Sequence, residues 1–441
     1  MKRSGLRAIS ALALCSAFGA CDNSGLVDYK PTGPGGAGGG PTASAGAGTS
    51  PGGDTSVPPG GGGGASGTGT AGSGSEPSAE CPGDDGSAAA LTLAGLGYSR
   101  PAALEDAGVN DAGSDGGSDA AASDAGAGPL EFAGFALPNL LGWATQPGLG
   151  TATTIGGAAG PVVTARTADQ LVAYASSPEP LVIRICGTLR APAVRVASHK
   201  TLLGVGSAAT LEGGLLVGGD SAYSRNIVIK NLRVNGAYSG VAHEAVRIER
   251  AHHVWLDHLE LFDTSGEAAL DIVSGSDLVT VSWSKVHFTP DTPDSEHRFG
   301  CRIGDHNEAD DVARAEDTGH LNVTLHHDWF ADDVRQRAPR VRFGSVHLFN
   351  NYYSIGTRAN DWSIWASTES RVLLENNYFK GVDNPHELNT VDAQLLSRNN
   401  VYDGATGSMQ STGSAFTPPY TYIPDTALSV PDLLTAGVGP R

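Results

Sequence analysis

Four arginines fall within eight residues of the segment VRQRAPRVRFG, Val334 to Gly344. They are Arg335, Arg337, Arg340 and Arg342. The chain has 441 residues and a formal net charge of −19, so this positive charge opposes the overall balance. Guanidinium groups bind carboxylates in a planar, two-pronged manner, and a local positive patch suits an anionic ligand. The alternative is that these arginines are solvated or ion-paired on an exposed strand.

Three acidic residues, Asp257, Glu267 and Asp271, lie near one another in the sequence among apolar neighbours. A carboxylate in an apolar run such as ALDIV is costly unless it is paired or bound to a cation. Three carboxylates are hard oxygen ligands and suit Ca²⁺, with one negative charge left over. We therefore expect weak calcium binding until a ligand completes the shell. An ion-pair network with Arg247 and Arg250 explains the same spacing equally well.

Short apolar strands recur through the second half of the chain. IVIKN, VWLDH, VTVSW, VTLHH, VHLFN, VLLEN and LLSRN begin at positions 227, 254, 279, 323, 346, 372 and 395. The steps are close to 25 residues except one of 44, which we interpret as one period plus a surface-loop insertion of about 20 residues near 289–320. The units are rich in β-branched residues and lack helical periodicity, and they are too short for propeller blades. The repeat therefore predicts a parallel β-helix.

The fifth residue of each unit is usually asparagine or histidine. These residues are Asn231, His258, Trp283, His327, Asn350, Asn376 and Asn399. We interpret them structurally: stacked asparagines at a turn hydrogen-bond along the coil and satisfy bent backbone.

The N-terminal part of the chain indicates export. Residues 1–20 combine a basic start with an apolar run of about a dozen residues, the pattern of a secretory signal. Small residues precede Cys21, which predicts a lipoprotein-type signal with lipidation at that cysteine; an ordinary signal peptide is the alternative. Residues 21–128 are Gly-, Ala-, Ser- and Asp-rich and predict a disordered tether. The folded domain is expected at 129–441.

Three cysteines remain after export and lipidation, namely Cys81, Cys186 and Cys301. An odd number allows at most one disulfide, so the chain is not a disulfide scaffold. Cys186 and Cys301 have apolar or glycine neighbours, and we interpret both as small buried side chains.

Long motifs, in order, resemble the pectate lyases of polysaccharide lyase family one. KTLLGVGSAATLEGG, NIVIKNLRV, VWLDHLEL, GEAALDIVSGSDLVTVSW and RQRAPRVRFGSVHLFNNYY carry the resemblance, which covers roughly 300 residues. It implies an all-β fold, a right-handed single-stranded parallel β-helix. It also implies calcium-dependent β-elimination of (1→4)-α-D-galacturonan, giving 4,5-unsaturated oligogalacturonides.

The resemblance assigns roles to individual residues. Arg337 matches the catalytic base and Arg342 the second arginine of the family's R-x-P-x-x-R motif, which holds substrate. Asp257, Glu267 and Asp271 match the calcium ligands. Family members often carry a substrate-binding lysine before an apolar IG segment, but here that segment reads SEHRFGCRIGDH. Arg298 is the nearest cationic substitute.

Rival functions remain open at the level of sequence. A pectin lyase acting on methyl-esterified pectin would be expected to lose the acidic set, and a non-catalytic surface β-helix could bind acidic polysaccharide without cleaving it. Nucleic acid is a poor partner for so acidic a chain. We expect a monomeric, secreted or cell-surface bacterial lipoprotein that meets a membrane only through its lipid anchor.

Overall fold

The computed structural model describes the C-terminal part of the chain and one cysteine before it. The described residues are Cys81, 139–219, 223–241, 243–264, 266, 268–293, 296–305, 311–354 and 361–441. The expected signal peptide and, Cys81 excepted, the expected tether therefore lie outside the described residues. Among the described residues, no helix has the length and apolarity needed to cross a membrane.

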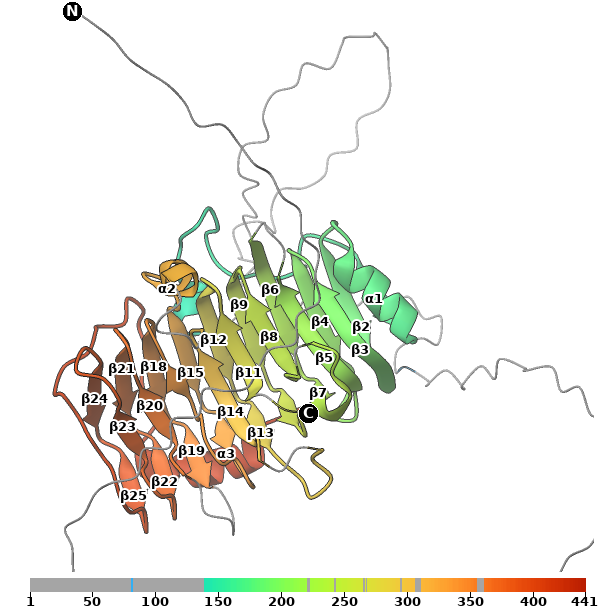
Figure 1. The fold of residues 1–441 in the computed structure, drawn as a ribbon. Coiled ribbons are helices and arrows are strands. Elements are labelled where there is room, and N and C mark those ends of the chain that lie inside the picture. The colour runs from blue at the N-terminus through green and yellow to red at the C-terminus, as the bar shows by residue number, and fades with distance from the viewer. Residues whose placement is uncertain are drawn as a thin grey trace, which may run out of the picture. The chain divides into compact units, whose positions relative to one another are not determined.

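The described chain winds as a stack of parallel strands (Figure 1). One face is a ten-stranded parallel sheet whose neighbours follow chain order. Its strands are β1 (Val162–Ala165), β2 (Leu181–Ile185), β4 (Lys200–Gly204), β6 (Ser224–Lys230), β9 (Ala251–Asp257), β12 (Asp277–Ser282), β15 (Val323–His326), β18 (Ser345–Phe349), β21 (Arg371–Glu375) and β24 (Gln394–Arg398). The last seven contain the seven repeated units, so the predicted parallel β-helix is confirmed.

The other faces belong to one fifteen-stranded sheet that divides at β5 (Thr210–Gly218), which also pairs with β3 (Thr188–Val196). The β8–β23 limb contains β8 (Val246–Glu249), β11 (Ala268–Val273), β14 (Phe299–Ile303), β17 (Arg340–Val341), β20 (Ile364–Ala366) and β23 (His386–Leu388). The β7–β25 limb contains β7 (Arg233–Asn235), β10 (Glu260–Phe262), β13 (Lys285–His287), β16 (Trp329–Phe330), β19 (Tyr352–Ser354), β22 (Tyr378–Lys380) and β25 (Val401–Asp403).

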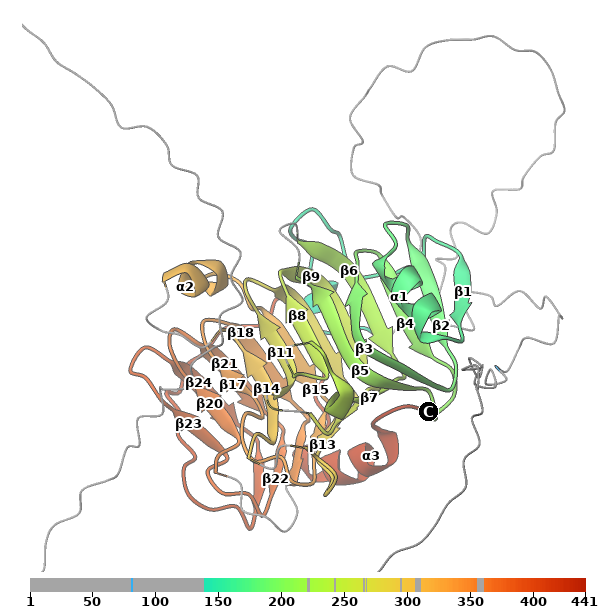
Figure 2. The ribbon, with the colours of Figure 1, turned by 45° about the vertical axis from the view of Figure 1, so that its right-hand side comes forward.

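Helices are few and lie outside the coil. They are α1 (Ala168–Ser176), α2 (Asp311–Asp317) and α3 (Val430–Gly437), with 3-10 turns η3 (Trp143–Thr145), η4 (Gly236–Tyr238) and η5 (Ala427–Ser429). Helix α1 begins where the Thr167 hydroxyl accepts a hydrogen bond from the Gln170 backbone N–H, a side-chain cap. It lies beside β2 and β3 at the first rungs (Figure 2).

Alternate side chains of each strand fill the coil with apolar atoms. Near the C-terminal rungs, the rings of Phe330, Tyr353, Phe379 and Tyr402 stack face to face, with neighbouring centroids 4.4–5.4 Å apart. Every ring comes from the same position of a successive rung of the β7–β25 limb. Burying such large rings in register removes apolar surface from water and fixes the spacing of the rungs.

Asparagines at the fifth position, Asn231 and Asn350, hydrogen-bond along the coil as predicted, and a second, buried ladder lies one residue later. Asn350 Nδ2 donates to the Asn376 carbonyl at 3.1 Å, and Asn231 Nδ2 donates to the Gly204 carbonyl at 2.9 Å. All seven fifth-position residues adopt left-handed backbone, with φ from 50° to 58°. This turn directs the next side chain into the protein, where Asp328, Asn351, Asn377 and Asn400 form the buried ladder. The Asn377 Oδ1 atom, for example, accepts from the Asn351 backbone N–H at 2.8 Å.

Two other expectations need correction. The segment near 289–320 is not only a surface loop, because it contains strand β14 of the β8–β23 limb and helix α2. Cys186 is not a free thiol, because it forms a disulfide with Cys81. Cys301 is free and buried, as predicted.

Candidate active site

The outer face of the β8–β23 limb carries a row of charged side chains at one level of the strands. Strand pairing aligns Arg247 with Asp271, Asp271 with Arg302, and Arg302 with Arg340. These positions face outward because the intervening residues, such as Leu270, belong to the core. Trp365 is aligned with Arg340, whose guanidinium carbon lies 5.3 Å from the centre of the indole ring, and Glu387 continues the row on the next strand.

Asp271 shares its surroundings with Glu244, an acid that the sequence analysis missed. Asp271 is fully buried and Glu244 is 1% exposed. Arg247 Nη1 donates to Glu244 Oε1 at 3.2 Å and to Asp271 Oδ2 at 3.3 Å. Arg302 donates to Asp271 Oδ2 through Nε at 3.0 Å and also through Nη2. The ion-pair alternative is therefore realised for Asp271 through Arg247, whereas Arg250 binds Glu249 and Glu316.

The two carboxyl groups interact strongly. Burial, and then the negative charge of Asp271, raises the pKa of Glu244 to about 9, although Arg247 opposes the shift. Two adjacent buried carboxyls do not both ionise readily without a cation between them. Burial and the charge of Asp271 therefore favour the protonated form of Glu244.

The same pair carries the carboxylate oxygens that are open to a cation. Glu244 Oε2 and Asp271 Oδ1 are buried and accept no hydrogen bond within the described part of the chain. Bare carboxylate oxygens are the donors that Ca²⁺ prefers. Among the described residues no group of three or more His, Cys, Asp or Glu side chains is arranged to hold a metal. Glu267, predicted as a ligand, lies outside the described residues, just before β11.

Asp257 lies elsewhere, on β9 of the ten-stranded sheet. Its Oδ1 atom accepts from the Ser282 hydroxyl at 2.7 Å. Its Oδ2 atom pairs with Lys230 Nζ at 2.7 Å and His258 Nδ1 at 2.8 Å. Both oxygens are thus occupied by protein groups, and the structure does not bring Asp257 to Asp271. This geometry favours a structural role, and the calcium role of Asp257 stays a prediction without geometric support.

Arg337 lies in the turn that precedes β17 (Arg340–Val341), on the far side of β14 from the Glu244–Asp271 pair. Its backbone is left-handed, with φ of 59°, and a cis peptide joins Ala338 to Pro339. The guanidinium carbon lies 4.1 Å from the centre of the Phe299 ring, which holds the charged group against β14. Since strands are spaced roughly 4.8 Å apart, about 10 Å separates β11 from β17.

The side chains of the other two predicted arginines are more buried than that of Arg337. Arg342 is 4% exposed, and its Nη1 atom donates to the Asp305 carbonyl at 3.3 Å. Arg298 is also 4% exposed, with Nη1 at 2.6 Å from Asp333 Oδ2. A buried, ion-paired Arg298 positions a loop more readily than it binds substrate, so its assigned role finds no support here. Cys21, the predicted lipidation site, lies outside the described residues.

Comparison with known proteins agrees with this architecture. A family model described as pectate lyase matches residues 133–436. A pectate trisaccharide-lyase of Thermotoga maritima is 32% identical over 216 residues, 46% of this chain and 54% of that protein. The chain thus spans about half the length of that relative. The Bacillus licheniformis pectate trisaccharide-lyase is 28% identical over 308 residues, 65% of this chain and 83% of that protein.

Solved structures share the fold. A pectate lyase from Bacillus sp. N165, crystallised with trigalacturonate, superposes with a TM-score of 0.57 at 24% identity, over 68% of this chain and 98% of that one. The family match extends over more than half of the chain and includes both limbs of the fifteen-stranded sheet. This chain belongs to the pectate lyase family.

Proposed function

We propose that the protein cleaves polygalacturonate by β-elimination on the outer face of the β8–β23 limb. One observation carries the proposal: Arg337, in an R-x-P-x-x-R motif, lies across β14 from a buried carboxyl pair with two bare oxygens. An anionic polymer needs a local positive field in a chain of net charge −19, and the row Arg247, Arg302 and Arg340 supplies it.

The reaction requires a base, a binding group for the uronate and a leaving group. Arg337 takes the proton from C5, the electron pair forms the C4=C5 double bond, and the glycosidic oxygen leaves C4 and acquires a proton. Arg302, Arg340 and Arg342 hold the sugar carboxylates and stabilise the charge that develops next to C5. Arginine is a poor base at neutral pH because its pKa is about 12.5 or higher, so we expect an alkaline optimum.

We propose calcium as the cofactor, held by Glu244 and Asp271, with Glu267 as a third ligand. Calcium bound there would act as a Lewis acid toward a uronate carboxylate. In its absence, Arg302 and Arg247 hold the two carboxyl groups in place. The bare oxygens Glu244 Oε2 and Asp271 Oδ1 support this assignment.

The test is ultraviolet absorbance of the unsaturated product, with polygalacturonate at alkaline pH. We expect formation of product that stops on chelation and returns with calcium. Arg337→Ala should reduce the rate by at least ~10²-fold, the lower limit for a proton-transfer group. Arg335→Ala is the matched control, because Arg335 pairs with Glu296 and Asp361 outside the row and should retain activity.

Two outcomes would contradict the proposal. Product from methyl-esterified pectin alone, insensitive to chelation, would assign a pectin lyase and remove calcium from the Glu244–Asp271 pair. Binding of polygalacturonate with no product from either polymer would assign a non-catalytic polysaccharide-binding protein.

A further inference from the structure

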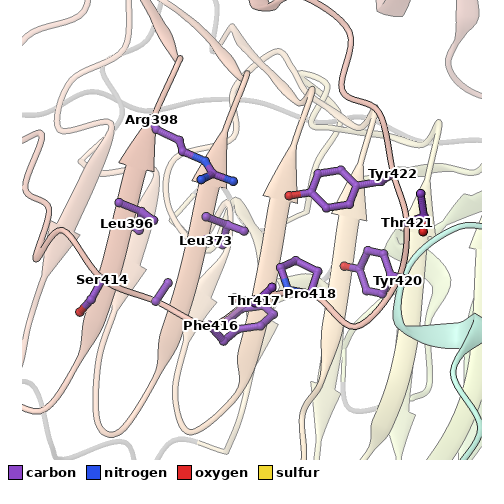
Figure 3. A pocket seen from close by; sticks show the side chains of 11 residues that line it. Leu373, Leu396, Arg398, Ser414, Phe416, Thr417, Pro418, Tyr420, Thr421 and Tyr422 are labelled. Atoms are coloured by element: carbon purple, nitrogen blue, oxygen red, sulfur yellow. The ribbon is translucent and has the colours of Figure 1, made fainter.

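The outer face of the ten-stranded sheet carries a pocket that is separate from the candidate active site on the β8–β23 limb. A C-terminal strap, residues 414–422, runs across this face and leaves a pocket of about 490 Å³ between itself and strands β21 and β24 (Figure 3). This volume lies in the range of ordinary small-ligand sites. Its wall includes Leu373, Leu396, Arg398, Phe416, Tyr420 and Tyr422.

The aromatic side of the pocket is held rigidly. The Tyr420 hydroxyl contacts Thr324 Oγ1 at 2.8 Å and His347 Nδ1 at 2.9 Å, both on the ten-stranded sheet. The Phe416 ring stacks on Trp143 with centroids 5.9 Å apart. These anchors fix the rings before a ligand arrives, so little conformational entropy is lost on binding.

The opposite side presents a positioned guanidinium. Arg398 Nε donates to Glu375 Oε2 at 2.6 Å, and Glu375 is only 3% exposed. His347 and Tyr422 also donate to this carboxylate, which lowers the pKa of Glu375 to about 2 and keeps it anionic. The Arg398 side chain is nevertheless 48% exposed and lines the pocket. Figure 3 shows this guanidinium directed toward Tyr422.

We propose that this pocket binds a uronate residue of an acidic oligosaccharide, with the sugar carboxylate on Arg398 and the apolar ring face on Phe416 and Tyr422. A fixed guanidinium recognises a carboxylate by paired hydrogen bonds, and rigid aromatic rings provide contact area for the sugar. The identity of the sugar as galacturonate rests on the proposed function. The pocket lies on a different sheet from the candidate active site, so it holds a polymer without cleaving it.

The experiment measures trigalacturonate binding by calorimetry to the full chain carrying Arg337→Ala, in chelator. We expect Leu396→Glu, which adds a carboxylate to the pocket, and Arg398→Gln to weaken this binding at least tenfold. Arg371→Gln is the matched control, because Arg371 is exposed on the neighbouring strand, β21, and does not line the pocket. A neutral galactose trisaccharide should bind much more weakly than trigalacturonate.

Arg398→Gln also removes a partner of buried Glu375, so thermal unfolding must accompany each binding measurement. Leu396→Glu leaves that ion pair intact and separates loss of binding from loss of fold. Unchanged affinity in a folded Leu396→Glu protein, or equal binding of the neutral trisaccharide, overturns the proposal. Because binding is measured without product formation, failure of the lyase assay with intact, Arg398-dependent binding would reject the proposed reaction and retain this pocket.

Discussion

At the scale of single residues, Asp257 and Asp271 are both buried acids that pair with basic side chains, but only Asp271 has an oxygen atom that accepts no hydrogen bond within the described residues. Hydrogen bonds from His258 and the charge of Lys230 hold the pKa of Asp257 below its ordinary value despite burial. Breaking such a buried pair typically costs about 3–5 kcal/mol. We therefore expect Asp257→Asn to lower the free energy of unfolding by that amount and to leave calcium affinity unchanged. Denaturant unfolding and calcium calorimetry on the same protein test both halves.

Asp271→Asn is the matched comparison, because it removes one bare oxygen of the proposed calcium pair. Its calcium affinity should fall at least tenfold. Loss of calcium binding in Asp257→Asn would support the ligand role that the sequence predicts for Asp257. Unchanged binding in Asp271→Asn would contradict both the sequence-based and the geometric assignment, because Asp271 belongs to both.

Arg302 occupies the calcium pair with its own charge. Removing a positive group a few ångströms from a divalent cation relieves a repulsion of several kcal/mol even at an effective dielectric constant of about 20. We expect Arg302→Met to bind calcium at least tenfold more tightly, as measured by calorimetry. Arg340→Met is the control, since Arg340 lies one strand further and over Trp365. Equal or weaker affinity in Arg302→Met would show that Arg302 does not compete with the metal.

The sequence singled out Arg337 and Arg342 because both lie in one short R-x-P-x-x-R motif that carries the family resemblance, and their roles stay predictions. Glu244 could not be found in this way. It meets Asp271 only because the β-helix aligns β8 with β11, two segments about 25 residues apart. The available signal was that Glu244 is an acidic residue just before β8, the strand that lies one repeat before β11. This signal becomes informative only once the register between β8 and β11 is known.

At the scale of elements, the buried ladder of side chains hydrogen-bonds successive rungs to one another inside the coil. Asn377 donates through Nδ2 to the carbonyls of Leu348 and Glu375, both at 3.0 Å, and accepts from the Asn351 N–H at 2.8 Å. An unsatisfied buried donor or acceptor costs about 1–3 kcal/mol. We expect Asn377→Ala to lower the free energy of unfolding by roughly 3 kcal/mol.

Asn376→Gly provides the control for the ladder prediction. Asn376 is half-buried at the left-handed turn, with φ of 54°, a conformation that glycine adopts without strain, and within the described residues its Nδ2 atom donates only to the Asp425 carbonyl, at 3.0 Å. We expect it to cost less than about 1 kcal/mol in denaturant unfolding. Equal losses at both positions would contradict the ladder.

The repeat period predicted the ten-stranded sheet because its units are apolar and evenly spaced. The β8–β23 limb was harder to foresee, since strands such as β17 contain only two residues and carry charged side chains. The buried ladder one residue after the fifth position was not foreseen, because it depends on the left-handed turn that directs the following side chain into the coil. The residue type does not predict this backbone conformation, because asparagine, histidine and tryptophan all adopt left-handed φ angles at the fifth position.

At the scale of the whole described molecule, Glu375 joins strands from two rungs to the C-terminal strap. His347 of β18, Arg398 of β24 and Tyr422 of the strap all donate to it. Their combined effect lowers its pKa from the ordinary 4.5 to about 2. A lowered carboxyl pKa contributes stability that is fully present above about pH 4.5 and is lost as the pH falls toward 2. The contribution amounts to about 3 kcal/mol at neutral pH.

Glu375→Gln mimics the protonated carboxyl and so isolates this contribution. At pH 7 we expect the variant to be less stable than the wild-type protein by about 3 kcal/mol, and the difference should shrink steadily between pH 4.5 and pH 2. Denaturant unfolding of both proteins across this range measures it. His347 is present in both, so its own titration affects the two curves alike to a first approximation. A difference that stays constant with pH would mean that Glu375 holds the strap by shape and hydrogen bonding rather than by charge.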